Sequence, residues 1–239
     1  MVPAHPTRAR KRAYRLALIG APVLCCALLL GSYAWHQHQL VEHQRQLVAE
    51  TSARLREILF NEQGSTESVM ETPGNMTYDE FFRACDKSLD ERNKLVVAVR
   101  LLPPNVLGPL RERITSHFKA MNELMRAKAN LMHVIVRWRS YSPSESSARF
   151  QGEFFRTHDG GLREAAEWAY EKGIAEINAL AQEMKQSAGE FDVLYDKCME
   201  EEQGISVEAR QVGMTFEPCL KRFAAENKAL SATARKRSG

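Results

Sequence analysis

Cysteine thiols are the side chains of this sequence best suited to covalent chemistry. Two of the five cysteines, Cys25 and Cys26, lie in an apolar N-terminal run, and Cys85, Cys198 and Cys219 follow further along. Thiols form disulfides in oxidising compartments, bind zinc when they are closely spaced, and act as nucleophiles when a base activates them. None of the three later cysteines belongs to a C-x-x-C pair. A disulfide is therefore the reaction of these three thiols that the sequence favours.

Common catalytic and cofactor motifs do not occur in the sequence. The missing patterns are G-x-S-x-G, Walker A, H-E-x-x-H, C-x-x-C and E-x-x-H, which mark serine hydrolases, nucleotide-binding proteins, zinc enzymes, redox or haem proteins and helical di-iron proteins. We therefore predict no catalytic residue, no cofactor-binding residue and no metal ligand, and we expect that the protein is not an enzyme.

The histidines and one lysine need a separate interpretation. His36, His38 and His43 form the only histidine cluster of the sequence, but no carboxylate pattern near them completes a metal site. We interpret them as polar anchors beside a membrane. His117 and Lys128 interrupt an apolar helical stripe. We expect them at the edges of that stripe with their polar ends in water, and the alternative is a buried functional pocket.

The first 35 residues have the pattern of a membrane anchor. The run from Leu16 to Trp35 contains no charge and is long enough to cross about 30 Å of hydrocarbon as a helix. The cationic residues that precede it are Arg8, Arg10, Lys11, Arg12 and Arg15. Such residues are retained on the cytoplasmic side, so we expect a single-pass inner-membrane protein with a cytoplasmic N-terminus and a periplasmic or otherwise extracytoplasmic C-terminal domain. A cleaved signal peptide is the alternative, because Ser32 and Ala34 are suitably small.

The net charge of +3 hides an acidic central region. The first 15 residues carry five positive charges and the last 12 carry four, so the region between them carries −6. This balance makes nucleic-acid binding through a basic face improbable. We expect partners of another kind, namely the membrane through Leu16 to Trp35 and another envelope protein, and a homo-oligomer stays open.

The sequence divides into six segments by composition and periodicity. We expect a cytoplasmic basic stub at 1–15, a transmembrane helix at 16–35, a helical stalk at 36–63, a linker at 64–76, an extracytoplasmic helical bundle at 77–230 and a basic flexible tail at 231–239. Gly64, Pro73 and Gly74 are the residues that indicate the linker.

Long amphipathic patterns predict an all-α fold, an antiparallel up-and-down bundle of about four long helices. Thr77 and Glu80 fit a capping box at the start of the first bundle helix, and Pro103 and Pro104 stop it. Further helices are expected over 109–139, 162–203 and from about 216. The clearest apolar stripe steps by four and three residues through Tyr170, Ile174, Ile177, Ala181, Met184, Ala188, Phe191, Tyr195 and Cys198. This stripe suits an intramolecular core, and an intermolecular coiled coil is the alternative.

This topology suggests which cysteines pair. Cys198 lies near the end of one predicted helix and Cys219 near the start of the next, so both belong to the same end of an antiparallel hairpin. We predict a Cys198–Cys219 disulfide, worth about 3 kcal/mol by the chain-entropy model. Cys85 would then be a free thiol or form an intermolecular link. The alternative is three buried thiols.

These features leave several classes of function. A membrane-anchored scaffold or accessory subunit that binds another envelope protein agrees with the acidic bundle and the missing motifs. A ligand-sensing bundle that signals through a partner subunit, or an envelope enzyme without a familiar motif, is the alternative.

Overall fold

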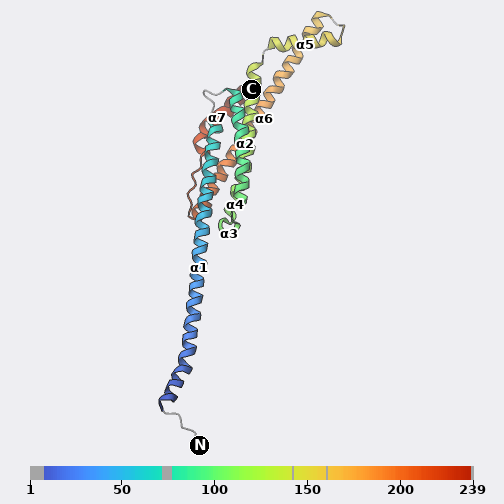
Figure 1. Cartoon of the computed structure of the whole chain (residues 1–239). Coiled ribbons are helices and arrows are strands. Elements are labelled where there is room, and N and C mark those ends of the chain that lie inside the picture. Colours follow the sequence, from blue (N-terminus) through green and yellow to red (C-terminus); the bar gives the residue numbers. More distant parts are fainter. Residues whose placement is uncertain (1–7, 72–76, 142, 160, 238–239) are drawn as a thin grey trace. The chain divides into compact units, whose positions relative to one another are not determined.

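A computed structural model of the chain describes residues 8–71, 77–141, 143–159 and 161–237, with side chains described from residue 28 onward except at 143–145. Every regular element in these residues is an α-helix, which confirms the predicted all-α class (Figure 1). The helices are α1 (Arg8–Met70), α2 (Tyr78–Arg100), the short α3 (Pro104–Leu107), α4 (Pro109–Ser140), α5 (Pro143–Thr157), α6 (Leu162–Gln211) and α7 (Leu220–Arg237).

The chain divides into two compact units, Met1–Ser52 and Ala53–Gly239, and their boundary falls within α1. In the first unit, the described side chains are largely exposed. No helix in the described part of the chain is both long and apolar enough to cross a membrane. Residues 16–27 of the expected membrane span lie outside the residues whose side chains are described, and so do its expected orienting residues Arg8, Arg10, Lys11, Arg12 and Arg15.

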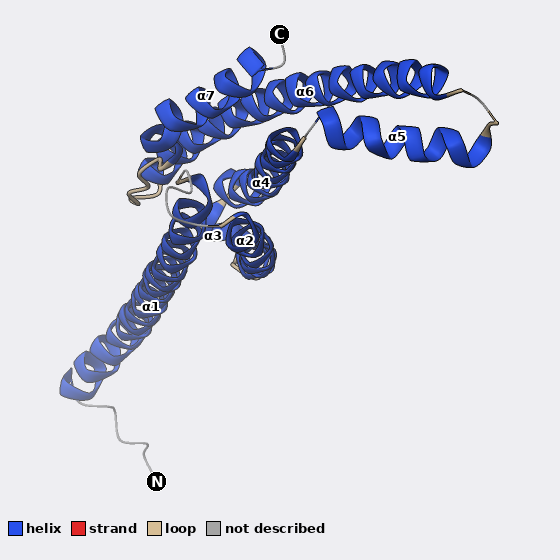
Figure 2. Cartoon of the chain, turned by 90° about the horizontal axis from the view of Figure 1, so that it is seen from above, coloured by secondary structure: helices blue, strands red, loops and turns tan. Residues whose placement is uncertain are grey.

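The helices of the second unit alternate in direction. The part of α1 that follows Ala53 runs opposite to α2, and α4, α6 and α7 continue the alternation (Figure 1). Helix α4 packs against both α2 and α6. Along α6, the N-terminal half lies beside α5 and the C-terminal half beside α7 (Figure 2). The end of α1 therefore joins α2, α4, α6 and α7 in the bundle.

Two apolar clusters form the core of this unit. One contains the end of α1 and aromatic and sulfur side chains such as Phe81, Met121 and Phe191. The other gathers aliphatic residues of the earlier turns of α1, including Leu55, around Phe118. Each fully buried side chain of this size contributes about 1.5–3 kcal/mol, so both clusters stabilise the packing of these helices.

The stalk and the linker differ from the sequence prediction. The linker was expected to begin at Gly64, but α1 continues to Met70, and both Val69 and Met70 are fully buried. A glycine inside a helix costs only about 1 kcal/mol relative to alanine, which is less than the burial of these two side chains provides. The predicted Pro73 and Gly74 break lies outside the described residues.

The last two helices also differ from the prediction. Helix α6 passes through Gly204 and ends at Gln211, because Ile205 and Ala209 are buried in the core. Gly204 lies against the side chain of Arg113, and a Cβ atom there would collide with the guanidinium unless that side chain moved. The basic tail is helical through Arg237 and buries Ala234, so it is not a flexible extension over these residues.

The expected capping box at the start of α2 is confirmed. The backbone N–H of Thr77 donates to Glu80 Oε2 at 2.7 Å, and the N–H of Glu80 donates to Thr77 Oγ1 at 3.3 Å. These bonds satisfy two donors that a helix start leaves without intrahelical partners. The backbone N–H of Thr77 also lowers the pKa of the Glu80 carboxyl, and the Thr77 hydroxyl, which donates to the same carboxylate at 2.8 Å, adds to this effect.

Candidate functional site

The cysteines of the bundle are free thiols in the structure. Cys85, Cys198 and Cys219 are all buried, and the predicted Cys198–Cys219 disulfide is not formed. Cys219 instead lies against the carboxylate of Glu202, with Sγ donating to Oε1 at 3.2 Å. Burial raises the pKa of Cys198 to about 12 and the pKa of Cys85 to about 11, and it raises that of Cys219 as well. Because the thiolate is the reactive form, these cysteines are unreactive where they lie.

His117 and Lys128 do not reach water, contrary to the sequence interpretation. Both side chains are fully buried. The Nζ atom of Lys128 donates to the backbone oxygen of Met70 at 2.9 Å, and Asn227 donates to the same oxygen at 3.1 Å. The last carbonyls of a helix lack intrahelical donors, so the two side chains cap the end of α1 from α4 and α7. Lys128 is therefore a structural residue of the core.

The charge of Lys128 is destabilised by this location. Burial lowers its pKa from 10.5 to about 8, and the opposing effects of Cys85 and Glu226 are smaller. The ammonium also lies 6.0 Å from the centre of the Phe81 ring.

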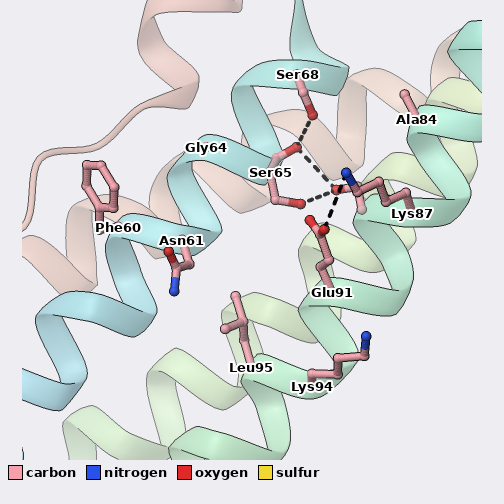
Figure 3. A pocket seen from close by; sticks show the side chains of 11 residues that line it. Phe60, Asn61, Gly64, Ser65, Ser68, Ala84, Lys87, Glu91, Lys94 and Leu95 are labelled. Carbon is pink, nitrogen blue, oxygen red and sulfur yellow. Dashed lines mark hydrogen bonds and ion pairs between the residues drawn. The ribbon is translucent and has the colours of Figure 1, made fainter.

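A groove of about 650 Å³ between α1 and α2 is the candidate site of the bundle (Figure 3). Residues 60–68 of α1 and residues 84–95 of α2 line it. Ser65 and Leu95 project into the space between the helices from opposite sides (Figure 3). Phe60 also belongs to the lining, and 75% of its surface is exposed. A volume of this size falls in the range of ligand-binding clefts.

Charged side chains line the α2 side of the groove. Lys87 and Lys94 are exposed on α2, and Glu91 lies between them in sequence at 3.9 Å from Lys87 Nζ. An exposed pair at this distance contributes little to stability, so these side chains are available to contact another molecule. Their sum is one positive charge, in a central region of the chain that carries −6.

Serines connect the groove to a buried ion pair. The hydroxyl groups of Ser65 and Ser88 lie 2.6 Å apart, and Ser88 also contacts the guanidinium of Arg92 at 3.5 Å. Arg92 and Glu62 are almost completely buried, and Arg92 Nε lies 3.4 Å from Glu62 Oε1. The same guanidinium donates to Thr66 at 3.0 Å. A buried charge needs such partners, so this network holds α2 against α1 beneath the groove.

The network extends to α4, which makes the groove wall part of the core. Arg92 Nη1 donates to Asn122 Oδ1 at 3.2 Å and lies 3.1 Å from Met125 Sδ. Three helices therefore share a single guanidinium, and the positions of Ser65 and Ser88 depend on it.

A second buried carboxylate holds the connection between α6 and α7. Glu202 accepts hydrogen bonds from the Leu220 N–H at 3.0 Å and from Cys219 Sγ. Burial raises the pKa of Glu202, and His117, the Leu220 N–H and the Cys219 thiol oppose this shift. His117 Nδ1 lies 3.6 Å from Glu201 Oε2. These contacts stabilise the bundle and do not open onto the groove between α1 and α2.

The structure brings together few of the residues that the sequence indicates as candidates for chemistry. Within the described residues, no group of three or more histidine, cysteine, aspartate or glutamate side chains is placed to hold a metal ion. His36, His38 and His43 are exposed in the first unit. Sequence analysis missed Glu62, Arg92 and the groove above them, although both residues are polar members of otherwise apolar helical stripes.

Comparison of the chain with protein-family models, with curated proteins and with solved structures finds no match. The groove and the residues around it are therefore the features from which a function can be inferred.

Proposed function

We propose that the protein is a single-pass inner-membrane protein whose extracytoplasmic bundle is a scaffold or accessory subunit, and that the groove between α1 and α2 binds a segment of another envelope protein. The observation that carries this proposal is the combination of apolar and charged side chains at an open groove. Phe60 and Leu95 offer apolar contacts, and Lys87 and Lys94 offer exposed positive charge. Interfaces commonly place aromatic side chains at their centre and charges at their rim.

The occupant that fits this groove is an amphipathic segment with acidic side chains. Its apolar residues would contact Phe60 and Leu95, and its carboxylates would reach Lys87 and Lys94. Opposite charges across such a rim accelerate association and select among partners. Lys87 and Lys94 would repel a basic segment, so the local positive charge of the groove sets this preference even though the central region of the chain is acidic.

Photo-crosslinking in intact cells tests the docking site. A photo-reactive amino acid at position 60 should capture one stoichiometric envelope protein, identified by mass spectrometry. Phe60→Ala combined with Lys94→Glu, assayed by co-purification of that protein, should reduce recovery at least tenfold. The matched control is Phe155→Ala with Lys221→Glu, which also changes an exposed phenylalanine and an exposed lysine. Equal recovery with both double variants would contradict the proposal.

The membrane anchor needs its own test. The proposal rests on the sequence pattern of Arg8 to Arg15 followed by Leu16 to Trp35. The chain isolated from membranes should retain residues 1–35, and a protease added outside the inner membrane should digest the bundle. A mature N-terminus at or near Trp35 would show cleavage and remove the anchor from the proposal.

A ligand-sensing bundle is the second candidate, and the groove volume of about 650 Å³ favours it. In that case a small molecule with carboxylate and apolar groups should raise the melting temperature of the purified chain. The same molecule should lose this effect with Lys94→Glu. Without such a shift, the scaffold is the better interpretation.

A further inference from the structure

The apolar stripe of α6 continues beyond the core of the bundle. Its C-terminal part is buried, from Met184 through Phe191 to Tyr195. Its N-terminal part, which we call the free seam, consists of Tyr170, Ile174, Ile177 and Ala181. Tyr170 is 65% exposed and Ile174 is 41% exposed, whereas Ile177 and Ala181 are half-buried. The apolar stripe is therefore part of the core along the C-terminal half of α6, whereas no described helix covers it along the N-terminal half.

The neighbouring helices explain why the free seam is bare. Helix α5 lies against another face of α6, where Ala165, Ala169 and Gly173 are buried. Arg149 of α5 pairs with Glu176 on that side. Helix α7 ends near Asp192, which pairs with Arg235, so it stops before it reaches Ala181. Helix α4 ends at Ser140. No described helix of the chain covers the face that carries Tyr170 and Ile174.

We propose that the free seam binds a second copy of this chain, with the two α6 helices antiparallel. The order of side-chain sizes along the free seam supports this arrangement. In an antiparallel pair, Tyr170 faces the partner's Ala181, and Ile174 faces the partner's Ile177. The remaining two layers repeat these contacts by two-fold symmetry. Each bulky tyrosine therefore meets a small alanine, and the two isoleucines pack against each other in the centre.

Charges next to the seam agree with this register. Glu167 and Lys185 are exposed on the same flank of α6, one beyond each end of the free seam. The antiparallel pairing places Glu167 close to the partner's Lys185 at both ends of the interface. A parallel pairing would place Glu167 beside the partner's Glu167 and Lys185 beside the partner's Lys185. Like charges at such positions oppose association, so the charges favour the antiparallel arrangement.

The length of the free seam predicts a reversible dimer. The distance from Tyr170 to Ala181 along the helix is about 17 Å at the rise of an α-helix. Four layers make a small interface, so we expect the association to be weak. The inference does not depend on the groove between α1 and α2 or on the membrane anchor, so it can fail while the proposed function stands.

Sedimentation of the full-length chain in mild detergent, over a range of concentrations, tests the dimer. The wild-type chain should show a monomer–dimer equilibrium. Ile174→Asp should weaken association at least tenfold. The matched control is Val193→Asp, because Val193 is 70% exposed on the opposite face of α6; this variant should dimerise like the wild type. Both aspartates replace exposed residues, and circular dichroism should show unchanged helix content. A wild-type chain that stays monomeric, or equal effects of both variants, would overturn the proposal.

Two further variants test the register. Oxidation of a mixture of Tyr170→Cys and Ala181→Cys chains, both also carrying Cys25→Ser and Cys26→Ser, should yield a disulfide between the two different variants, because the remaining native thiols, Cys85, Cys198 and Cys219, are buried. A disulfide that forms in the Tyr170→Cys chain alone would indicate parallel helices and overturn the antiparallel pairing. Glu167→Lys should weaken the dimer severalfold, and adding Lys185→Glu should restore it. Failure of this restoration would also contradict the register.

Discussion

Replacement of Lys128 by methionine should stabilise the bundle at neutral pH. The lysine is fully buried and its pKa is lowered from 10.5 to about 8. A lowered pKa means that folding favours the neutral amine. Above about pH 10.5, the pKa in the unfolded chain, the amine is neutral in both states and its burial carries no penalty. The stability is lost as the pH falls through about 8, the pKa in the folded chain. The wild-type chain therefore carries at pH 7 a penalty for holding a buried charge, and methionine has a similar length without that charge.

The size of the effect follows from the pKa shift and one hydrogen bond. A shift from 10.5 to about 8 corresponds to about 3 kcal/mol of destabilisation at pH 7. The variant loses the bond from Nζ to the Met70 oxygen, worth about 1 kcal/mol. Asn227 still donates to that oxygen, so no carbonyl is left without a partner. We expect a net gain of about 2 kcal/mol at pH 7, equivalent to about 4–8 °C in melting temperature.

The dependence on pH identifies the cause of this gain. Urea unfolding of the full-length chain in nonionic detergent, followed by circular dichroism, should give the difference in unfolding free energy between variant and wild type at pH 7, 8, 9 and 10. By pH 10 most of the penalty is gone, so the difference should fall to about zero. Lys221→Met, at an exposed position on α7, should show no such trend. A Lys128→Met variant that is less stable than the wild type by a constant amount across this range would refute the reasoning.

Two other predictions concern the buried carboxylates. Arg92→Met should lower the free energy of unfolding by about 3–5 kcal/mol, because it leaves Glu62 buried without its charge partner. Glu62→Met combined with Arg92→Met should have a free energy of unfolding within about 1 kcal/mol of the wild type. Equal losses in the two proteins, measured by urea unfolding, would contradict this. Burial raises the pKa of Glu202, so the stability that its neutral form contributes below about pH 4.5 is lost as the pH rises through the folded-state pKa. Glu202→Gln should therefore become more stable relative to the wild type from pH 4.5 to pH 8, and a constant difference in unfolding free energy would argue against a raised pKa.

The helices were predictable because their signals are local. The capping box at Thr77 and the prolines at 103 and 104 act within one turn of the chain, and the structure has a helix boundary at each. The break expected at Gly64 and the helix end expected at residue 203, just before Gly204, were wrong, because a glycine ends a helix only when no residue beyond it becomes buried. Val69 and Met70 follow the first glycine, and Ile205 and Ala209 follow the second. Whether such residues are buried depends on helices far away in sequence.

The positions of the polar side chains in the core also depend on helices that are distant in sequence. Glu62, Arg92, Lys128 and Glu202 each occupy a stripe position that the periodicity assigns to the core. A charge at such a position could lie at an edge or meet a partner inside, and its own helix contains no information on which occurs. For Arg92 the partners come from α1 and α4, and for Lys128 the partner is the end of α1. The groove above Arg92 follows from these pairings and was therefore hidden from sequence analysis.

The cover of the apolar stripe of α6 also depends on the neighbouring helices. Its step of four and three residues is unbroken from Tyr170 to Cys198, and the sequence left open whether it formed a core within one chain or a contact between two chains. The structure divides it near Ala181, because α7 covers only the C-terminal part. Both alternatives can then hold on one helix, the core from Met184 onward and the proposed contact from Tyr170 to Ala181. A periodic stripe predicts that a face will be covered, and only the lengths of the neighbouring helices determine whether the cover is intramolecular.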